Sequence, residues 1–120
     1  MLRDFLLVGI GGALGSMARY GLTLLASYAS IASEIGTFAA NAIGSLLIGI
    51  IIALSKGDWY LFGAVGFCGG FTTFSTFSVQ ALHLLQSSQR SMGILYIFAS
   101  LLVCILMTWV GITLADKFFK

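Results

Sequence analysis

Few side chains in this sequence of 120 residues could hold or move an ion, and they recur at regular spacing. Asn41, the only asparagine, lies midway between Thr37 and Ser45, four residues from each. A second set with the same spacing, near the end of the chain, consists of Tyr96, Ser100, Cys104 and Thr108. Residues four apart share one face of a helix. Each set therefore predicts a line of uncharged polar groups along an otherwise apolar helix, and these groups can donate hydrogen bonds.

The stretch from Gly66 to Ser78 predicts an interrupted helix. Its first half is rich in glycine and its second half in Thr, Ser and Phe, within an apolar segment from Trp59 to Leu85. Glycine costs about 1 kcal/mol relative to alanine in a helix, and Thr and Phe lose rotamer freedom there. An interruption frees backbone groups that a membrane tolerates only inside protein or along a polar cavity. The alternative is a kinked helix repaired by its own hydroxyl groups, but the rest of the chain favours an ion site.

The same stretch has two series with a spacing of three residues. One is aromatic (Phe71, Phe74 and Phe77), and the other carries hydroxyl groups (Thr72, Ser75 and Ser78). We expect the three rings to stack on one helix face, beside a face of hydroxyl groups. Such a stripe is usually packing, but the edge of a phenyl ring is electropositive and can contact an anion.

Composition places the whole chain in a membrane. Hydrophobic residues make up 59% of the sequence and charged residues 8%, and the mean hydropathy is +1.06. These values predict an all-α integral membrane protein with one domain, residues 1–120, and four transmembrane helices. The expected spans are about 5–28, 35–54, 59–85 and 92–115. Small residues four apart predict close helix packing in the first two spans, at Gly11 and Gly15 and at Gly36, Ala40 and Gly44.

Charge narrows the possible functions. The four acidic residues all fall at the ends of the predicted spans: Asp4, Glu34, Asp58 and Asp116. A proton antiporter or a cation channel normally needs a carboxylate in the membrane, so an anion is the better candidate. A net charge of +2 does not suggest nucleic-acid binding. No His or carboxylate is placed to activate a nucleophile, so we do not expect an enzyme.

Four further side chains are interpreted separately. Arg19, inside the first span, is a functional candidate, but it could also snorkel to the interface or cap nearby carbonyl groups. Cys68 and Cys104 are expected to be free, apolar thiols rather than a disulfide. His83 is assigned no role.

The motifs resemble those of the Fluc/CrcB fluoride channels. The first is Gly11-Gly12 with Gly15 and Arg19-Tyr20, the second is Gly36-Thr37 with Asn41 and Gly44, and the third is the run from Gly66 to Phe77. The resemblance implies a fluoride-selective channel that passively exports fluoride, lowers its cytoplasmic concentration and so confers fluoride resistance. It also implies a multi-pass protein of the bacterial inner (plasma) membrane. The expected assembly is an antiparallel homodimer of dual topology in membrane lipid, with two pores and a third helix broken near the bilayer midplane.

The resemblance also implies roles for individual residues. Fluoride would contact the ring edges of Phe74 and Phe77, and the other pore residues would be Asn41, Thr37 and Ser75. Tyr96, Ser100 and Thr108 are the candidates on the fourth helix, where Cys104 occupies a position at which a hydroxyl is more usual. A structural Na⁺ at the dimer centre would be held by the backbone carbonyls of Gly69 and Thr72. Arg19 would have a supporting role.

Two alternatives and a difficulty of topology stay open at this point. A small multidrug-type four-helix transporter would need a Glu in the first span, which has none. A non-transporting membrane assembly subunit would leave the polar lines unexplained. The basic residues favour a cytoplasmic N-terminus, whereas dual topology calls for near balance: one side carries Arg3, Lys56, Lys117 and Lys120, and the other Arg90 with Arg19.

Overall fold

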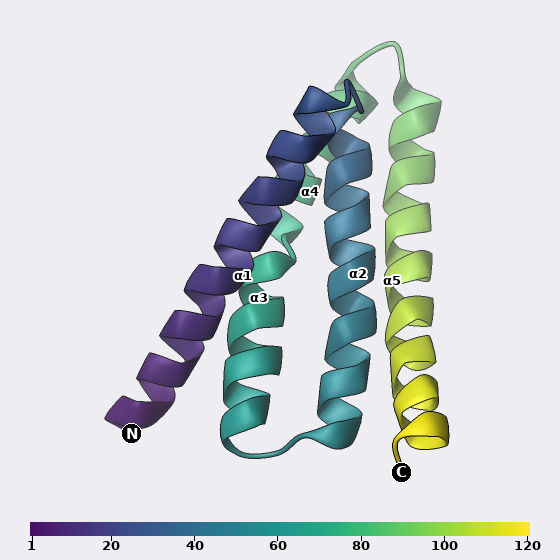
Figure 1. The fold of residues 1–120 in the computed structure, drawn as a ribbon. Coiled ribbons are helices and arrows are strands. Elements are labelled where there is room, and N and C mark those ends of the chain that lie inside the picture. The colour runs from purple at the N-terminus through teal and green to yellow at the C-terminus, as the bar shows by residue number, and fades with distance from the viewer.

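The computed structural model describes residues 1–120, and all of its regular structure is helical. Successive segments run up and down, and both termini lie at the same end (Figure 1). The order is α1 (Leu2–Tyr28), α2 (Ser33–Leu54), η1 (Tyr60–Cys68), α3 (Gly69–Phe71), α4 (Phe74–Gln86) and α5 (Arg90–Phe118). η1 is a π-helical segment that continues directly into α3.

Three of these helices are long and apolar enough to cross a membrane: α1, α2 and α5, with 27, 22 and 29 residues. At a rise of about 1.5 Å per residue, each exceeds the roughly 30 Å of a hydrocarbon core. The region expected as the third span contains η1, α3 and α4 instead of one continuous helix. Whether all four regions cross a bilayer with the expected boundaries stays a prediction.

Glycine brings α1 close to η1 and α3. A Cβ atom at Gly11 would overlap the carbonyl oxygen of Phe62, and one at Gly15 would overlap that of Phe67. On the other side of the contact, Gly70 has no room for a Cβ because the carbonyl of Gly12 occupies the space. These contacts confirm the close approach predicted from the spacing of Gly11 and Gly15.

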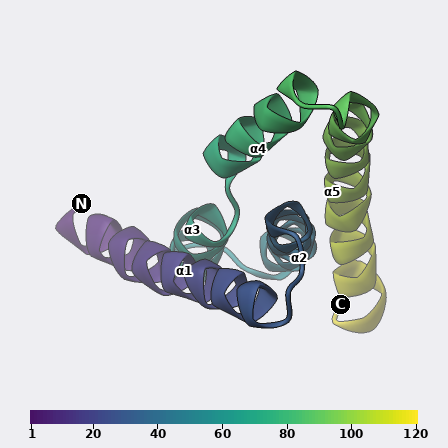
Figure 2. The same ribbon diagram turned by 90° about the horizontal axis from the view of Figure 1, so that it is seen from above.

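A second glycine contact joins α2 to α5. A Cβ at Gly49 would overlap the carbonyl oxygen of Thr108, and a Cβ at Gly111 would overlap that of Leu46. Seen from above, α2 occupies the middle of the molecule, with α1 and α3 on one side of it and α5 on the other (Figure 2). The two helices that carry the polar lines, α2 and α5, are therefore held against each other.

α4 leaves the direction of α3 and runs toward the start of α5 (Figure 2). It packs on α5 through a small buried cluster that consists of Phe77, Ala81, Leu84 and Tyr96. The exposed surface of the molecule is otherwise largely apolar, and only 20 of 120 residues are buried. Because large side chains such as Phe98 and Trp109 are more than 60% exposed, this surface needs lipid or another protein chain against it.

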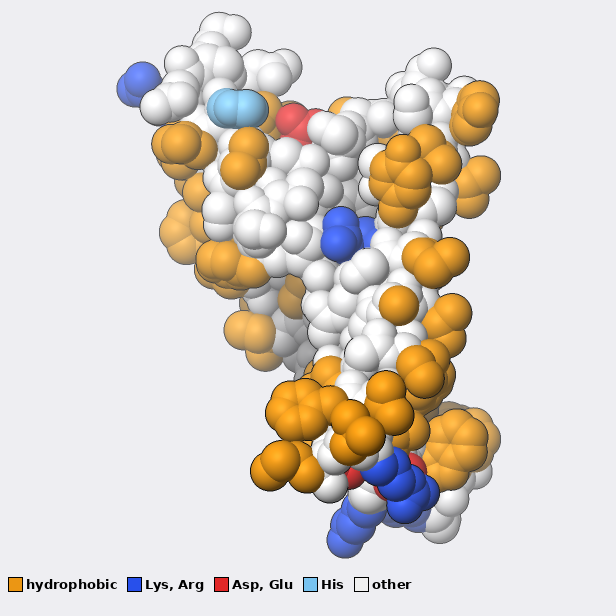
Figure 3. Space-filling model, turned by 90° about the vertical axis from the view of Figure 1, so that its left-hand side faces the viewer, with side chains coloured by type: hydrophobic (Ala, Val, Ile, Leu, Met, Phe, Trp, Pro, Cys, Tyr) orange, Lys and Arg blue, Asp and Glu red, His pale blue; other side chains and the backbone are white.

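Charged groups gather at the end of the molecule that holds the termini (Figure 3). Arg3 pairs there with Asp58, and Lys120 pairs with Asp116 at 2.9 Å. The turn between α2 and η1 contains Gly57 in the left-handed region, with φ +62°, where glycine is strongly favoured. A belt of apolar side chains between charged ends is the arrangement expected of a membrane protein.

Gly15→Ala should lower the free energy of unfolding by about 1–3 kcal/mol, because the added methyl group meets the Phe67 carbonyl and forces α1 away from η1. The matched control is Gly9→Ala on the same helix, where a Cβ meets nothing within 4 Å. That variant should be neutral or up to about 1 kcal/mol more stable. Unfolding of both variants in detergent micelles, followed by tryptophan fluorescence, measures the difference. Equal stability would contradict the close contact.

Candidate functional site

The site is built around two extended residues, Thr72 and Thr73, which separate α3 from α4 and are called the interruption below. The Thr72 N–H and hydroxyl both donate to the carbonyl of Cys68, at 3.0 and 2.9 Å. The Thr73 hydroxyl accepts the N–H of Thr76 at 3.2 Å and so caps α4. Gly44 of α2 makes room for Thr72, because a Cβ there would overlap the Thr72 methyl group.

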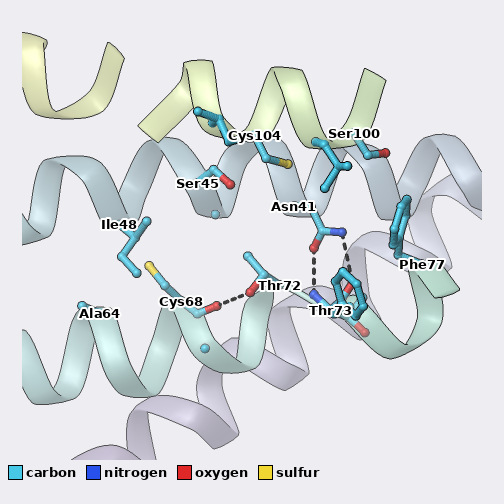
Figure 4. Close-up of a pocket in the computed structure, with 15 residues that line it drawn as sticks. Asn41, Ser45, Ile48, Ala64, Cys68, Thr72, Thr73, Phe77, Ser100 and Cys104 are labelled. Atoms are coloured by element: carbon cyan, nitrogen blue, oxygen red, sulfur yellow. Dashed lines mark hydrogen bonds between the residues drawn. The ribbon is translucent and has the colours of Figure 1, made fainter. Parts of the chain in front are cut away.

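Asn41 binds both backbone groups of Thr73 (Figure 4). Its Nδ2 donates to the Thr73 carbonyl at 3.0 Å, and its Oδ1 accepts the Thr73 N–H at 2.7 Å. The side chain thus supplies from α2 the two partners that a continuous helix would have supplied. One of the two Nδ2 hydrogens is used in this pair, which leaves the other for a further acceptor. Asn41 therefore joins α2 to the interruption and keeps one hydrogen for a further acceptor.

Arg19 supports the same region from α1. Its Nε donates to the carbonyl of Gly70 at 3.1 Å, and the side chain is partly buried. Of the interpretations given for Arg19, this contact confirms the capping of a neighbouring carbonyl group. The guanidinium carries the one charge in direct contact with the residues around the interruption.

A pocket of about 370 Å³ lies between α2, α5 and the segments on either side of the interruption (Figure 4). Four of the predicted pore residues line it: Asn41, Phe74, Phe77 and Ser100. Ser45 and the thiols of Cys68 and Cys104 also face it, and both cysteines are free. No Asp, Glu, Lys, Arg or His side chain lines this pocket. Its polar groups are therefore neutral.

Ser100 lines the pocket and carries an unpaired hydroxyl group. The residue is 5% exposed, and its hydroxyl oxygen is buried without a hydrogen-bond partner. An unpaired buried hydroxyl costs about 1–3 kcal/mol. The same hydroxyl would gain that interaction from an acceptor that comes within hydrogen-bond distance of it.

Phe74 and Phe77 lie next to each other but differ in burial. Phe74 is 74% exposed, whereas Phe77 is 7% exposed. Their ring centroids are 5.6 Å apart with a tilt of 53°. Phe77 also packs on Tyr96, with centroids 5.1 Å apart. Phe77 is thus fixed in the core, while Phe74 presents its ring at the open side of the pocket.

The expected stack of three phenyl rings is wrong. Phe71 precedes the interruption and stacks on Phe67 at 5.7 Å, away from the α4 pair. The two extended residues after it take Phe71 out of the helical register of α4. The series of hydroxyl groups is divided in the same way, because Thr72 belongs to the interruption. Ser78, on α4, donates to the carbonyl of Phe74 at 2.9 Å.

Two more predicted residues form a second polar group beyond Phe77. Tyr96 is 7% exposed and donates its hydroxyl hydrogen to Oε1 of Gln80 at 2.7 Å. Thr37, 9% exposed, lies close to the same hydroxyl. Neither Thr37 nor Tyr96 lines the pocket. Phe77 lies between the pocket and this second polar group, because it lines the pocket and packs on Tyr96.

The remaining predicted residues stand outside both groups. Ser75 is exposed on α4, with its hydroxyl 3.5 Å from that of Thr73. Thr108 donates to the carbonyl of Cys104 on its own helix at 3.1 Å. Two important residues were missed, Thr73 and Gln80. Thr73 lies three residues before Thr76, the spacing of a helix cap, and this could have pointed to it. Gln80 lies three residues after Phe77 and so shares its helix face, which was the only signal for Gln80.

Two backbone carbonyls at the interruption remain free for a cation. Hydrogen bonds occupy those of Cys68, Gly70 and Thr73, but none of the bonds at the interruption uses those of Gly69 and Thr72. Both residues line the pocket, and the space beside Gly69 is open. Hard cations prefer oxygen ligands. The donor set therefore fits Na⁺, and a cluster of three or more His, Cys, Asp or Glu side chains is absent from the chain.

The sequence matches known proteins over nearly its whole length. A family model described as "CrcB-like protein, Camphor Resistance (CrcB)" matches residues 6–112. A relative from Thermus thermophilus named "Fluoride-specific ion channel FluC" is 42% identical over 116 residues, 92% of this chain and 93% of its own. Relatives of the same name are 36% identical in Saccharophagus degradans, covering 94% of this chain and 90% of theirs. A relative of the same name from Bacteroides fragilis is 38% identical, covering 98% of this chain and 99% of its own.

Asn41→Leu should lower the free energy of unfolding by about 2–4 kcal/mol, because each backbone group of Thr73 left unpaired costs about 1–3 kcal/mol. Asn41→Asp keeps the acceptor and loses the donor, so an intermediate loss is expected. The matched control is Ser45→Ala, one turn along α2, which lines the pocket without binding Thr73. Denaturant unfolding in micelles measures all three. Equal stability of Asn41→Leu and Ser45→Ala would show that the pair does not hold the interruption.

Proposed function

The chain belongs to the CrcB family, and from this membership we propose that it is a fluoride-selective channel. It lets fluoride leave the cell down its gradient and thereby lowers cytoplasmic fluoride. It is a channel rather than an enzyme, as its relatives are. The observation that carries the proposal beyond family membership is the neutral pocket at the interruption, with open hydrogen-bond donors and no carboxylate.

Neutral donors suit a small anion that must leave its hydration shell. A channel replaces lost water contacts with its own groups, and it binds the ion weakly enough to release it again. The free Nδ2 hydrogen of Asn41 and the unpaired hydroxyl of Ser100 supply such donors from α2 and α5. A carboxylate in the same pocket would repel the anion. The absence of carboxylates from the lining fits fluoride and argues against a cation as the ion that passes through.

Phe74 and Phe77 supply the third kind of contact. The electropositive ring edge attracts an anion without a full charge. The 53° tilt between the two rings turns their edges in different directions, so that an ion beside them can meet an edge and a hydroxyl group together. Phe74, the more exposed ring, receives the ion first in this proposal.

The path continues past Phe77 to the second polar group. Thr37 and Tyr96 lie one helical turn from Asn41 and Ser100 on their respective helices, so the two lines border one continuous route. Thr108 has its hydroxyl committed to its own helix and lies at the other end of the α5 line. Ser75 borders the interruption from the exposed side.

The functional unit in this proposal is an antiparallel homodimer of dual topology in the bacterial inner membrane. A second copy and lipid would cover the exposed apolar surface. The regions η1, α3 and α4 together make the third crossing, which brings the interruption near the midplane. Na⁺ at the dimer centre would be held by the carbonyls of Gly69 and Thr72 from each copy, and its charge would neutralise these carbonyl dipoles. Basic residues gathered at one end favour one orientation, whereas insertion in both orientations calls for near balance. The charge bias must therefore be small enough for both orientations to occur.

The deciding experiment is efflux of fluoride from liposomes that contain the purified protein, without ATP and without a proton gradient. Fluoride should leave rapidly and chloride should not. Phe74→Ile should slow fluoride release by at least about tenfold and leave the fold intact, because Phe74 is exposed and makes little of the core. Val79→Ile, also exposed on α4, is the matched control. Folded protein that releases neither anion would sink the proposal, and wild-type rates in Phe74→Ile would reduce that ring to packing.

The assembly and its cation are tested together. The mass of the purified protein in detergent, corrected for bound detergent, should be twice 12.7 kDa. Replacing Na⁺ by N-methylglucamine at equal ionic strength should lower the thermal midpoint, because a ligand that binds only the folded dimer stabilises it. K⁺ serves as the control for cation size. A monomer, or the same midpoint in all three salts, would contradict the proposed Na⁺ site.

A further inference from the structure

A second pocket, of about 390 Å³, opens at the end of the molecule that holds the termini. Its lining consists of Leu7 of α1, Asp58 and Trp59 just before η1, and Phe62 of η1. None of these residues lines the pocket at the interruption. Three of the four side chains are apolar, and the fourth is a carboxylate. The function proposed above gives this second pocket no role.

The second pocket exists because α1 and η1 touch at one level and separate at another. A Cβ at Gly66 of η1 would meet the carbonyl oxygen of Val8 at 2.9 Å, so the two backbones are in contact there. Nearer its N-terminus, α1 leans away from η1 (Figure 1). An ion pair between Arg3 and Asp58 bridges the separated ends. The result is a wedge with apolar walls and a charged rim.

This wedge lies at the level where a bilayer changes from hydrocarbon to headgroups. Charged side chains gather at this end of the molecule (Figure 3). Trp59 is 73% exposed, and tryptophan is enriched at the boundary between membrane and water. On α1, the nearby Leu2, Phe5 and Leu6 are all more than half exposed. The occupant of such a pocket must therefore be amphipathic, with an apolar body inside and a polar head at the rim.

The rim decides which polar head fits. The side chains of Arg3 and Asp58 remain 74% and 45% exposed, and an exposed ion pair contributes little to stability. A guanidinium has five N–H donors and a carboxylate has two acceptor oxygens, so each group can bind more than its partner. Arg3 can bind a phosphate through parallel hydrogen bonds, and Asp58 can accept a hydrogen from a primary ammonium. A phosphate joined to an ammonium by a short linker is the headgroup of phosphatidylethanolamine.

We propose that the second pocket binds one molecule of phosphatidylethanolamine from the surrounding bilayer. The phosphate lies against Arg3, and the ammonium donates to Asp58. The first part of an acyl chain lies between Leu7, Trp59 and Phe62. A choline headgroup has no N–H and cannot donate to Asp58, and a glycerol headgroup has no positive charge to match the carboxylate. The pocket therefore selects ethanolamine over both.

The two tryptophans of the chain allow the pocket to be observed selectively. Trp109→Phe leaves Trp59, in the pocket, as the only tryptophan. Trp59→Phe leaves Trp109, which is 63% exposed on α5 and lies outside the pocket. Each variant is reconstituted in phosphatidylcholine vesicles that contain a rising fraction of one lipid brominated in its acyl chains, because bromine quenches tryptophan fluorescence on contact. Brominated lipids with ethanolamine, choline and glycerol headgroups are compared.

The ethanolamine lipid should half-quench Trp59 at a mole fraction about threefold lower than either other lipid, as one exposed charged contact would produce. Trp109 should be quenched equally by all three lipids, because no charged rim stands beside it to select a headgroup. Equal quenching of Trp59 by the three lipids overturns the proposal. Stronger quenching by the glycerol lipid also overturns it, since the rim would then select negative charge alone.

Two charge variants, both made in Trp109→Phe, separate headgroup binding from the ion pair itself. Asp58→Asn should abolish the preference for ethanolamine over choline, and a preference that persists overturns the proposal. Arg3→Gln breaks the same ion pair but leaves the carboxylate, so the preference should remain or increase. If the pair served only to hold α1 to η1, Arg3→Gln would also lose the preference, and that result overturns the proposal.

The control for both variants is Asp116→Asn, which breaks the other ion pair at this end of the molecule and should leave the preference unchanged. Arg3→Gln decides alone if Asp58→Asn does not fold as judged by gel filtration. None of these measurements uses fluoride, so their outcome is independent of the channel proposal.

Discussion

Backbone groups freed at Thr72 and Thr73 must find hydrogen-bond partners inside a largely apolar chain. The rest of the structure depends on this constraint. Three elements contribute. Asn41 of α2 binds Thr73, Arg19 of α1 binds the carbonyl of Gly70, and the two threonines use their own hydroxyl groups. Such contacts require helices at close range. The glycines that line α1, α2 and η1 permit that range.

What these partners leave unused determines the chemistry of the site. Arg19 and Asn41 occupy two carbonyls, while those of Gly69 and Thr72 stay free for a cation. Asn41 uses one amide hydrogen and keeps the other. A single interruption therefore leaves groups of both polarities unused, because two carbonyl oxygens and one amide hydrogen have no partner there. The arrangement does not require a formal charge on the pocket wall.

The sequence alone predicted part of this arrangement. Spacing located the close glycine contacts of α1 and the polar lines, and the stretch from Gly66 to Ser78 contained the interruption. The sequence could not show that Phe71 lies before the interruption and not after it. Residues spaced three apart form the same pattern whether or not the helix continues. Nor could the sequence show that the hydroxyl of Ser100 is unpaired while that of Thr108 donates to a carbonyl of its own helix. Both residues fit the same four-residue spacing. Gln80 has no repeating neighbours, so only the fold could show its partner.

The uncharged lining of the pocket has a consequence for how ions arrive. Attraction between fixed charges is screened by salt, with a Debye length of about 8 Å at physiological ionic strength, and such attraction speeds encounter from a distance. Neutral donors act only at contact and are not weakened in this way. A pore lined by such donors does not attract ions from a distance. The supply of ions to its mouth therefore depends on their concentration alone, at low and at high salt.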